Sequence, residues 1–243
     1  MSIEPVLRKR VDVVIPVYNE VKVLEGSVGR TLNLFAQNPA FDWRVVIADN
    51  GSTDGTSELA RRLESEHPGL VKALVLTIKG RGLALKEAWT TSDADVVSYM
   101  DVDLSTDLAH LPKLIEMVAS GGCDVAIGSR LAKGSQTDRQ LKREITSRGY
   151  VALIRMTFPR LKLTDAQCGF KALSRKAVVT VVPKIENRMW FFDTEMLILA
   201  HQAGLTICEL PVTWVEDKDT KVKIVSTAME DIRGLARMRL RRR

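Results

Sequence analysis

The chain has 243 residues, of which 45% are hydrophobic and 27% are charged, which is typical of one large globular domain with its own core. The net charge is +6, and much of the excess comes from arginines clustered at the C-terminal end. The sequence lacks both the ~18–20 apolar residues of a membrane span and the apolar core of a secretory signal, so we do not expect the chain as given to cross a bilayer.

Cysteine and histidine residues are few and scattered. The three cysteines, Cys123, Cys168 and Cys208, are odd in number and far apart in sequence. That pattern suits neither a disulfide framework nor a zinc site, so we expect unpaired thiols and a reducing compartment. The histidines are equally dispersed, which argues against a metal site built from imidazoles.

Apolar runs and turn signals predict alternating strands and helices over the first half of the chain. The predicted strands cover residues 11–17, 44–48, 71–77, 95–100 and 125–128. The predicted helices cover residues 19–37, a segment after the 49–55 turn that ends near His67, residues 83–89 and residues 107–119. This alternation implies βαβ crossovers, and therefore an α/β fold with a mostly parallel sheet flanked by helices.

The pattern changes after Arg130. Helices are predicted over residues 138–158, 193–203 and 224–240, with a short helix capped by Ser174, and strands over 171–173 and 207–215. In the last helix one apolar face is predicted to contain Ile224, Ala228, Ile232, Leu235 and Ala236. We therefore expect a domain over residues 1–225 and a basic amphipathic helix over 226–243, which either lies close to a membrane or packs its apolar stripe on the domain.

Polar clusters follow all five of the first predicted strands, where each strand ends. They are residues 18–20, 49–50, 79, 101–103 and 129–130. Because ligands of parallel sheets bind at the carboxyl ends of the strands, we expect these five loops to meet in one binding site.

The pair Asp101 and Asp103 follows an apolar strand directly. Two carboxylates in such a loop suit a hard cation such as Mg²⁺ or Mn²⁺, with water and phosphate as its other ligands. Such an ion neutralises a diphosphate leaving group. Other motifs fail: Pro112 stands where an EF-hand loop needs Glu, and Leu85 stands where a dinucleotide fingerprint needs Gly.

Seven short motifs in order carry a family resemblance. They are residues 16–20 (PVYNE), 49–56 (DNGSTDGT), 79–84 (KGRGLA), 101–103 (DVD), 128–130 (GSR), 165–171 (DAQCGFK) and 190–195 (WFFDTE). The chain resembles family-2 glycosyltransferases of the GT-A (Rossmann-like) fold, from about Val11 to Val225. Within them it is similar to dolichyl-phosphate β-glucosyltransferases, with dolichol-phosphate mannose synthases as close relatives.

The resemblance implies a set of donor-binding residues. Pro16, Tyr18, Glu20, Asp49, Asn50, Lys79 and Asp101 match positions that contact the nucleotide sugar. Asn50 departs from the family's second Asp, and an amide can donate where a carboxylate cannot. The metal would be held by Asp101 and Asp103, with Ser105 standing where mannose synthases have Gln.

The remaining matches concern the acceptor and the reaction. Arg130, Ser147, Arg148 and Lys221 match basic or polar positions that hold phosphates. Read without the family, Arg130 could instead pair with a carboxylate, and Arg148 could lie on a solvated helix face. Asp103, Asp165 and Asp193 are the candidates for the reaction centre, where Asp165 could position the acceptor or an arginine.

The expected function is inverting transfer of a hexose from a nucleotide sugar, most simply glucose from UDP-glucose, to a polyprenyl phosphate. The expected partners are that donor, the lipid acceptor and the cytoplasmic face of a membrane, with a homo-oligomer allowed and no nucleic acid. Alternatives are a GDP-mannose donor, a hydroxyl acceptor with Asp193 as the base, and a non-catalytic binding module that uses the basic tail.

Overall fold

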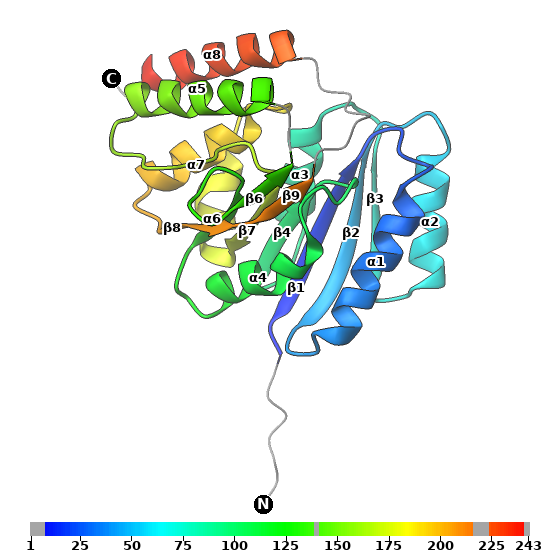
Figure 1. Ribbon diagram of the computed structural model, residues 1–243. Coiled ribbons are helices and arrows are strands. Elements are labelled where there is room, and N and C mark those ends of the chain that lie inside the picture. Colours follow the sequence, from blue (N-terminus) through cyan, green and yellow to red (C-terminus); the bar gives the residue numbers. More distant parts are fainter. Residues whose placement is uncertain (1–7, 139–140, 216–223, 241–243) are drawn as a thin grey trace, which may run out of the picture.

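The computed structural model describes residues 8–138, 141–215 and 224–240 (Figure 1). Its centre is a seven-stranded sheet in the order β3-β2-β1-β4-β7-β5-β8. The strands, in that order, are β3 (Val71–Leu76), β2 (Asp42–Asn50), β1 (Arg10–Val17), β4 (Val96–Met100), β7 (Phe170–Ser174), β5 (Val125–Ser129) and β8 (Ile207–Pro211). Only β7 runs antiparallel to its neighbours β4 and β5, so the predicted mostly parallel sheet is confirmed.

Helices cover both faces of the sheet (Figure 1). One face packs against α1 (Leu24–Gln37), α2 (Thr56–Glu66) and α4 (Leu111–Ala119). The other packs against α3 (Arg81–Thr90), α5 (Leu141–Thr157), α6 (Arg175–Val181), α7 (Phe192–Gln202) and α8 (Ile224–Leu240). Strand residues are buried on both sides, as the continuous apolar runs predicted.

Three predicted elements differ in their limits. The first helix begins at Leu24 rather than Asn19, because Asn19 has a left-handed backbone with a φ of 57°. Residues 107–119 form a short 3₁₀ helix, η1 (Leu108–His110), followed by α4 with Pro112 in its first turn. A second 3₁₀ helix, η2 (Val182–Lys184), follows α6.

The predicted strand over residues 207–215 is two strands in two sheets. It splits into β8 and β9 (Thr213–Val215), and β9 pairs with β6 (Gln136–Asp138), a polar strand that no apolar pattern announces. The split follows Pro211, which has no N–H to donate to a ladder. As a result β9 leaves the main sheet beside the loop that follows β5.

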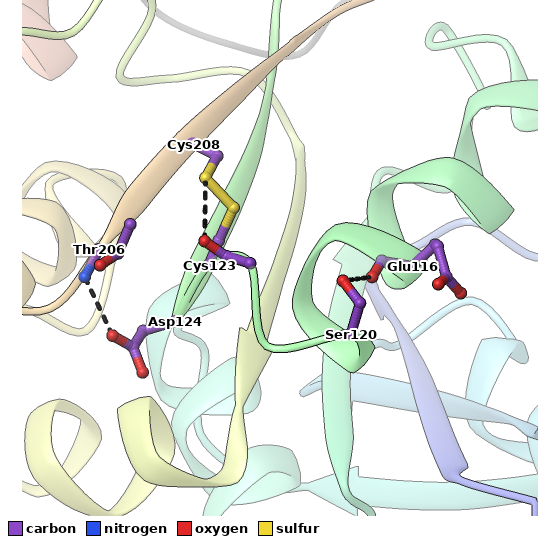
Figure 2. The surroundings of a disulfide bond; sticks show 7 residues. Glu116, Ser120, Cys123, Asp124, Thr206 and Cys208 are labelled. Atoms are coloured by element: carbon purple, nitrogen blue, oxygen red, sulfur yellow. Dashed lines mark hydrogen bonds between the residues drawn. A yellow bond between two sulfur atoms is a disulfide. The ribbon is translucent and has the colours of Figure 1, made fainter.

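The prediction of unpaired cysteines is wrong for two of the three. Cys123 and Cys208 form a disulfide, with Cα atoms 6.0 Å apart (Figure 2). They meet because β5 and β8 are neighbours, with Ala126 opposite Cys208. A spacing of 85 residues gave no hint of this pairing. The cysteines therefore no longer support a reducing compartment; Cys168 is a buried free thiol.

Helix α8 lies beside α5 (Figure 1). The apolar face predicted for this helix is only partly the face that packs on the domain. Leu235 and Met238 are buried against the domain, whereas Ile232 and Ala236 are exposed. The side chains of Ile224 and Ala228 lie outside the described part of the structure, and the boundary at residue 225 stays a prediction. Within the described residues, no helix combines the length and apolar character that crossing a membrane requires.

Candidate active site

The five predicted loops do meet at one edge of the sheet, since β1 to β5 all end there. The loops after β1 and β2 are joined by side-chain hydrogen bonds. Asn19 Oδ1 accepts from the Thr53 N–H at 2.8 Å, and Ser52 Oγ accepts from the Asn19 N–H at 2.9 Å. Asn tolerates the left-handed backbone that this contact requires. The two loops therefore form one wall of the site.

Asp49 and Asn50 lie at the end of β2 and are almost fully buried. Asp49 accepts hydrogen bonds from the Ser52 N–H and hydroxyl and from the Ser57 hydroxyl. Asn50 donates to the Val17 carbonyl at 2.6 Å and accepts from the Gly80 N–H at 3.2 Å. A carboxylate could not make both bonds. The departure from the family's second Asp thus has a structural reason: the amide connects the ends of β1 and β2 to the turn before α3.

The other residues predicted on the nucleotide side lie on the same wall. Lys79 Nζ sits 3.7 Å from the centre of the Tyr18 ring, a cation–π contact. The Glu20 N–H donates to Thr56 Oγ1 at 2.9 Å, and Pro16 lies in β1 beside Ala48. The structure therefore brings together residues from the loops after β1, β2 and β3.

Asp101 and Asp103 follow β4 in a tight turn. The side chain of Asp101 is 45% exposed, and Asp103 is exposed and accepts from the Ser105 N–H at 2.9 Å. Leu104, which follows Asp103, has a φ of 52°, a conformation that costs energy for a bulky side chain and is found at functional sites. Directly below, Gly169 approaches so closely that a Cβ atom there would overlap the Asp101 carboxylate.

The turn fits a hard divalent cation that completes its coordination with phosphate and water. No set of three or more His, Cys, Asp or Glu side chains among the described residues could hold a metal alone. Two exposed carboxylates match a cation that arrives with a diphosphate. Ser105 is half-buried, and its carbonyl accepts from the Val215 N–H at 2.9 Å.

Arg81, at the start of α3, lies at the centre of the site. Its guanidinium pairs with Asp101 at 3.0 Å and with Asp193 at 2.9 Å, and it lies over the rings of Tyr99 and Trp190. Burial opposes its charge, but nearby groups including both carboxylates outweigh burial and raise the pKa of Arg81 well above its usual value. Arg81 therefore links the exposed carboxylate after β4 to the buried one at the start of α7.

Asp193 is almost fully buried among partners. Lys171, which has no exposed surface, pairs with it at 2.8 Å, and the Tyr99 hydroxyl donates to it. Burial alone would raise the pKa of Asp193, but Lys171 and Arg81 hold it below the usual value. A carboxylate so compensated is a weak base.

Arg130 and Asp165 form a second buried pair. The guanidinium makes a two-pronged contact at 2.6 and 3.0 Å, and the Arg130 N–H adds a third bond at 3.2 Å. Burial alone would raise the pKa of Asp165, but Arg130 lowers it below the usual value. The alternative in which Arg130 pairs with a carboxylate, and Asp165 positions an arginine, is confirmed. The guanidinium also lies over the ring of Trp214 in β9, with 5.7 Å between Arg130 Cζ and the centre of the ring.

The predicted phosphate residues on α5 lie on an exposed helix surface. Arg148 is 60% exposed and pairs with Glu144 one turn earlier at 2.7 Å, and Ser147 beside it is half-buried. This matches the solvated-face alternative for Arg148. Lys221 lies outside the described residues.

Sequence reasoning missed Arg81 and Lys171 as site residues. Arg81 lies inside the 79–84 motif, in which the resemblance pointed to Lys79 instead. Lys171 is the residue opposite Tyr99 in the β4–β7 pair, so its cation is aimed at the site by the sheet register. A lysine in an otherwise apolar predicted strand was the available signal, since a buried cation needs a partner.

Comparisons with known proteins agree with this geometry. The family model described as glycosyl transferase family 2 matches residues 12–181. Glycosyltransferase AglD of Haloferax volcanii is 41% identical over 232 residues, which cover 95% of this chain and 36% of AglD. Dolichyl-phosphate beta-glucosyltransferase ALG5A of Trichomonas vaginalis is 30% identical over 219 residues, 87% of this chain and 67% of that protein. The chain thus spans about a third of the length of AglD.

Among solved structures, glucosyl-3-phosphoglycerate synthase from Mycobacterium tuberculosis has the same fold. Its complex with Mn²⁺, uridine-diphosphate-glucose and phosphoglyceric acid superposes with a TM-score of 0.70 at 18% identity, covering 93% of this chain and 78% of that one. At this identity the likeness establishes the GT-A fold, which confirms the fold expected from the sequence.

Proposed function

The chain belongs to glycosyl transferase family 2, and from that premise we propose that it transfers one hexose from a nucleotide sugar to a polyprenyl phosphate. The observation that carries the proposal is the pairing of an exposed two-carboxylate turn with buried cations at the same sheet edge. A dolichyl-phosphate glucosyltransferase among its relatives supports glucose from UDP-glucose as the donor. GDP-mannose is the alternative that the resemblance leaves open.

On the donor side, Asp101 and Asp103 would hold Mg²⁺ or Mn²⁺. Such an ion, when bound, neutralises charge that builds on a departing nucleoside diphosphate. The wall formed by the loops after β1 and β2 orients the nucleotide. Asn50 fixes the turn before α3 to this wall through its hydrogen bonds to Val17 and Gly80. Lys79, held over Tyr18, adds a positive charge near the phosphates.

On the acceptor side, the state of the buried carboxylates favours a phosphate over a hydroxyl. A hydroxyl nucleophile needs a general base, whereas a phosphate monoester with a second pKa of ~6 is already largely anionic at neutral pH. Asp193 and Asp165 have lowered pKa values because Lys171 and Arg130, respectively, stabilise their charges. Neither suits a base, so we assign them to orienting cations. An anionic acceptor oxygen then attacks the anomeric carbon in line with the leaving group, which inverts the centre.

The surface of α5 and α8 supports docking at a membrane. Five large apolar side chains on the two adjacent helices are at least half exposed: Ile145, Met156, Met229, Ile232 and Leu240. Exposed arginines accompany them, among them Arg148, Arg233 and Arg239. Apolar side chains flanked by cations suit the interface of an anionic bilayer. The cytoplasmic face remains our prediction for that surface, and it now depends on the resemblance alone.

A transfer assay tests the reaction. UDP-glucose and GDP-mannose are each incubated with a short polyprenyl phosphate, or with the matching polyprenol, in detergent with Mn²⁺, with Mg²⁺ or with EDTA. We expect product from UDP-glucose and the phosphate only, and none with EDTA. Transfer to the alcohol at an equal rate would contradict the argument from the buried carboxylates.

A liposome assay tests the docking surface separately. Ile145→Ser, Met156→Ser and Ile232→Ser are combined, and the matched control is Val179→Ser, which removes an exposed apolar side chain from α6. We expect the triple variant to partition to anionic liposomes at least about tenfold less, since each inserted side chain contributes about 1.5–3 kcal/mol. Equal loss in the control, or none in the triple variant, would rule out this surface.

A further inference from the structure

Helix α8 is connected by polar contacts to both segments that carry the buried carboxylates of the site. Asp231 accepts a hydrogen bond from the Gln167 side chain at 2.9 Å, in the turn that begins with Asp165. Glu230 accepts from the Asn187 side chain at 2.7 Å, and Arg237 pairs with Glu195 at 2.9 Å. These last two contacts hold the segment that leads into α7 and Asp193. The helix therefore forms a wall of the site as well as its outer surface.

Asp231 differs from Glu230 and Arg237 because one oxygen of its carboxylate lacks a hydrogen-bond partner. The residue is 4% exposed, one carboxylate oxygen accepts from Gln167, and the other, Oδ1, has no hydrogen-bond partner. A buried polar atom without a partner lowers the stability of the folded state. Burial raises the pKa of Asp231 to about 7; hydrogen bonds from Gln167 and Tyr150 oppose this rise, and the charges of Glu230 and Asp193 add to it. A group that weakens the fold in this way invites a functional explanation.

Gln167 leads directly to the candidate acceptor site. Its backbone N–H donates to Asp165 Oδ1 at 3.0 Å, while its side chain is held by Asp231. Asp165 in turn holds the Arg130 guanidinium with a two-pronged contact. Three successive contacts therefore run from the core-facing side of α8 to the cation proposed to meet the acceptor phosphate.

The surroundings of Asp231 include groups from two further helices. Tyr150 of α5 donates its hydroxyl hydrogen to Thr194 of α7 at 2.8 Å, and burial, together with interaction with Asp231, raises the pKa of Tyr150. The charged or titratable groups that face Asp231 are therefore Glu230 on its own helix, Tyr150 on α5 and Asp193 on α7. Among the described groups that face it there is no cation, so neutral donors hold the carboxylate: Gln167 at 2.9 Å and, more weakly, Tyr150.

We propose that Asp231 is a positioning residue, which holds Gln167 and thereby aims the Asp165–Arg130 pair at the acceptor phosphate. Packing of α8 on the domain is then coupled to ordering of the acceptor site. This inference rests on the proposed function for the identity of the acceptor, but the coupling itself concerns only contacts within the chain.

A double-mutant cycle tests the coupling in the full chain. The variants are Asp231→Ala, Gln167→Ala, both together, and Asp231→Asn, which keeps an oxygen able to accept from Gln167. The matched control is Met238→Ala, which removes another buried side chain of α8 two turns away. Each is assayed in detergent with a short polyprenyl phosphate, so that bilayer binding does not enter, and by hydrogen exchange of residues 164–168.

We expect Asp231→Ala to raise the KM for the acceptor about tenfold, the size expected for a lost hydrogen bond to a charged group, with the donor KM unchanged. Gln167→Ala should match it, and the double variant should be no worse than either. Asp231→Asn should restore most of the affinity and the slow exchange of residues 164–168. Met238→Ala should lower the melting temperature and leave the acceptor KM unchanged.

Several outcomes would overturn the inference: additive losses in the double variant, failure of Asp231→Asn to rescue, or an equal rise of the acceptor KM in Met238→Ala. If the wild type transfers nothing to polyprenyl phosphate, the proposed function fails. The exchange of residues 164–168 then still decides whether Asp231 orders this turn, because that readout needs no substrate.

Discussion

The two sides of the site use the same residue type in opposite ways. On the donor side, Asp101 is 45% exposed and Asp103 is exposed, in a turn with a left-handed Leu104. On the acceptor side, Asp165 and Asp193 are 2% and 3% exposed, and each is matched by a buried cation. The first pair reaches the surface, where we propose that it binds an external ion, although Asp101 also contacts Arg81. The second has its charge balanced inside the protein, so it shapes the site and takes up no proton.

The largest expected effect comes from the exposed side. Asp103→Asn should reduce transfer by at least about a thousandfold, because it removes a charge that helps to stabilise the leaving group through the cation. The melting temperature should change little, since the side chain is exposed. The control is Asp107→Asn, the same change at a helix cap four residues on. Retained transfer in Asp103→Asn would remove the distinction between the two sides.

The next effect comes from the buried side and acts on folding. Asp193→Ala leaves Lys171 without its ion-pair partner in a site with no exposed surface, so the free energy of unfolding should fall by about 3–5 kcal/mol. Asp93→Ala, which breaks exposed pairs with Arg10 and Arg44, should cost less than about 1 kcal/mol. Urea unfolding of both variants measures the difference. Similar losses of unfolding free energy in the two variants would mean that burial does not strengthen the Lys171–Asp193 pair relative to an exposed pair.

A third prediction concerns a region remote from both sides. The Cys123–Cys208 disulfide joins β5 and β8 near the ends opposite the site. Replacing both cysteines by Ser should lower stability by about 2–4 kcal/mol, the range for loss of a native disulfide, and leave transfer kinetics unaltered. A reductant should shift the melting of the wild type and not that of the variant. If the wild type does not respond, the bond is absent in solution.

The smallest effect depends on pH. Asp231 has a pKa raised by burial to about 7 in the folded chain, against 3.8 as the ordinary value. Between these values the folded protein keeps a proton that the unfolded chain has lost, so stability falls as pH rises through this window and is constant above it. From pH 5 to pH 8 the loss is at most about 3 kcal/mol, from two pH units at about 1.4 kcal/mol each.

Asp231→Asn removes that titrating group. Its stability advantage over the wild type should therefore grow between pH 5 and pH 8, as measured by urea unfolding at both values. A constant difference would mean that the carboxylate is charged throughout this range, as we expect for Asp165 and Asp193, whose pKa values are lowered.

The sequence predicted the architecture and the donor side better than the acceptor side. Strand order along the chain and polar residues at strand ends are local signals, so the meeting of Asp49, Asp101 and Arg130 at one edge could be predicted. Contacts between residues on different strands could not be predicted. The contacts of Lys171 depend on the antiparallel register of β7 against β4, and the disulfide depends on β5 lying beside β8. Neither pairing leaves a trace in local periodicity.

The conformation of the last helix shows the same limit. Its spacing predicted an apolar stripe that includes Ile232, but the buried side is set by Asp231, Leu235 and Met238, which meet groups contributed by distant segments. A polar residue in the core-facing position disguises the stripe. The sequence alone did not predict that Asp231 would accept a hydrogen bond from Gln167.

Gly169 gives the molecule one further property. The two-carboxylate turn rests on bare backbone at this position, since the Gly169 carbonyl accepts from the Asp101 N–H at 3.2 Å and no methyl group would fit beneath the carboxylate. Residues around Arg130 could therefore be changed to suit a bulkier acceptor only while Gly169 is kept. One added carbon at Gly169 would displace the carboxylate of Asp101, which we propose to bind the metal, so the glycine is a fixed point for any attempt to change specificity.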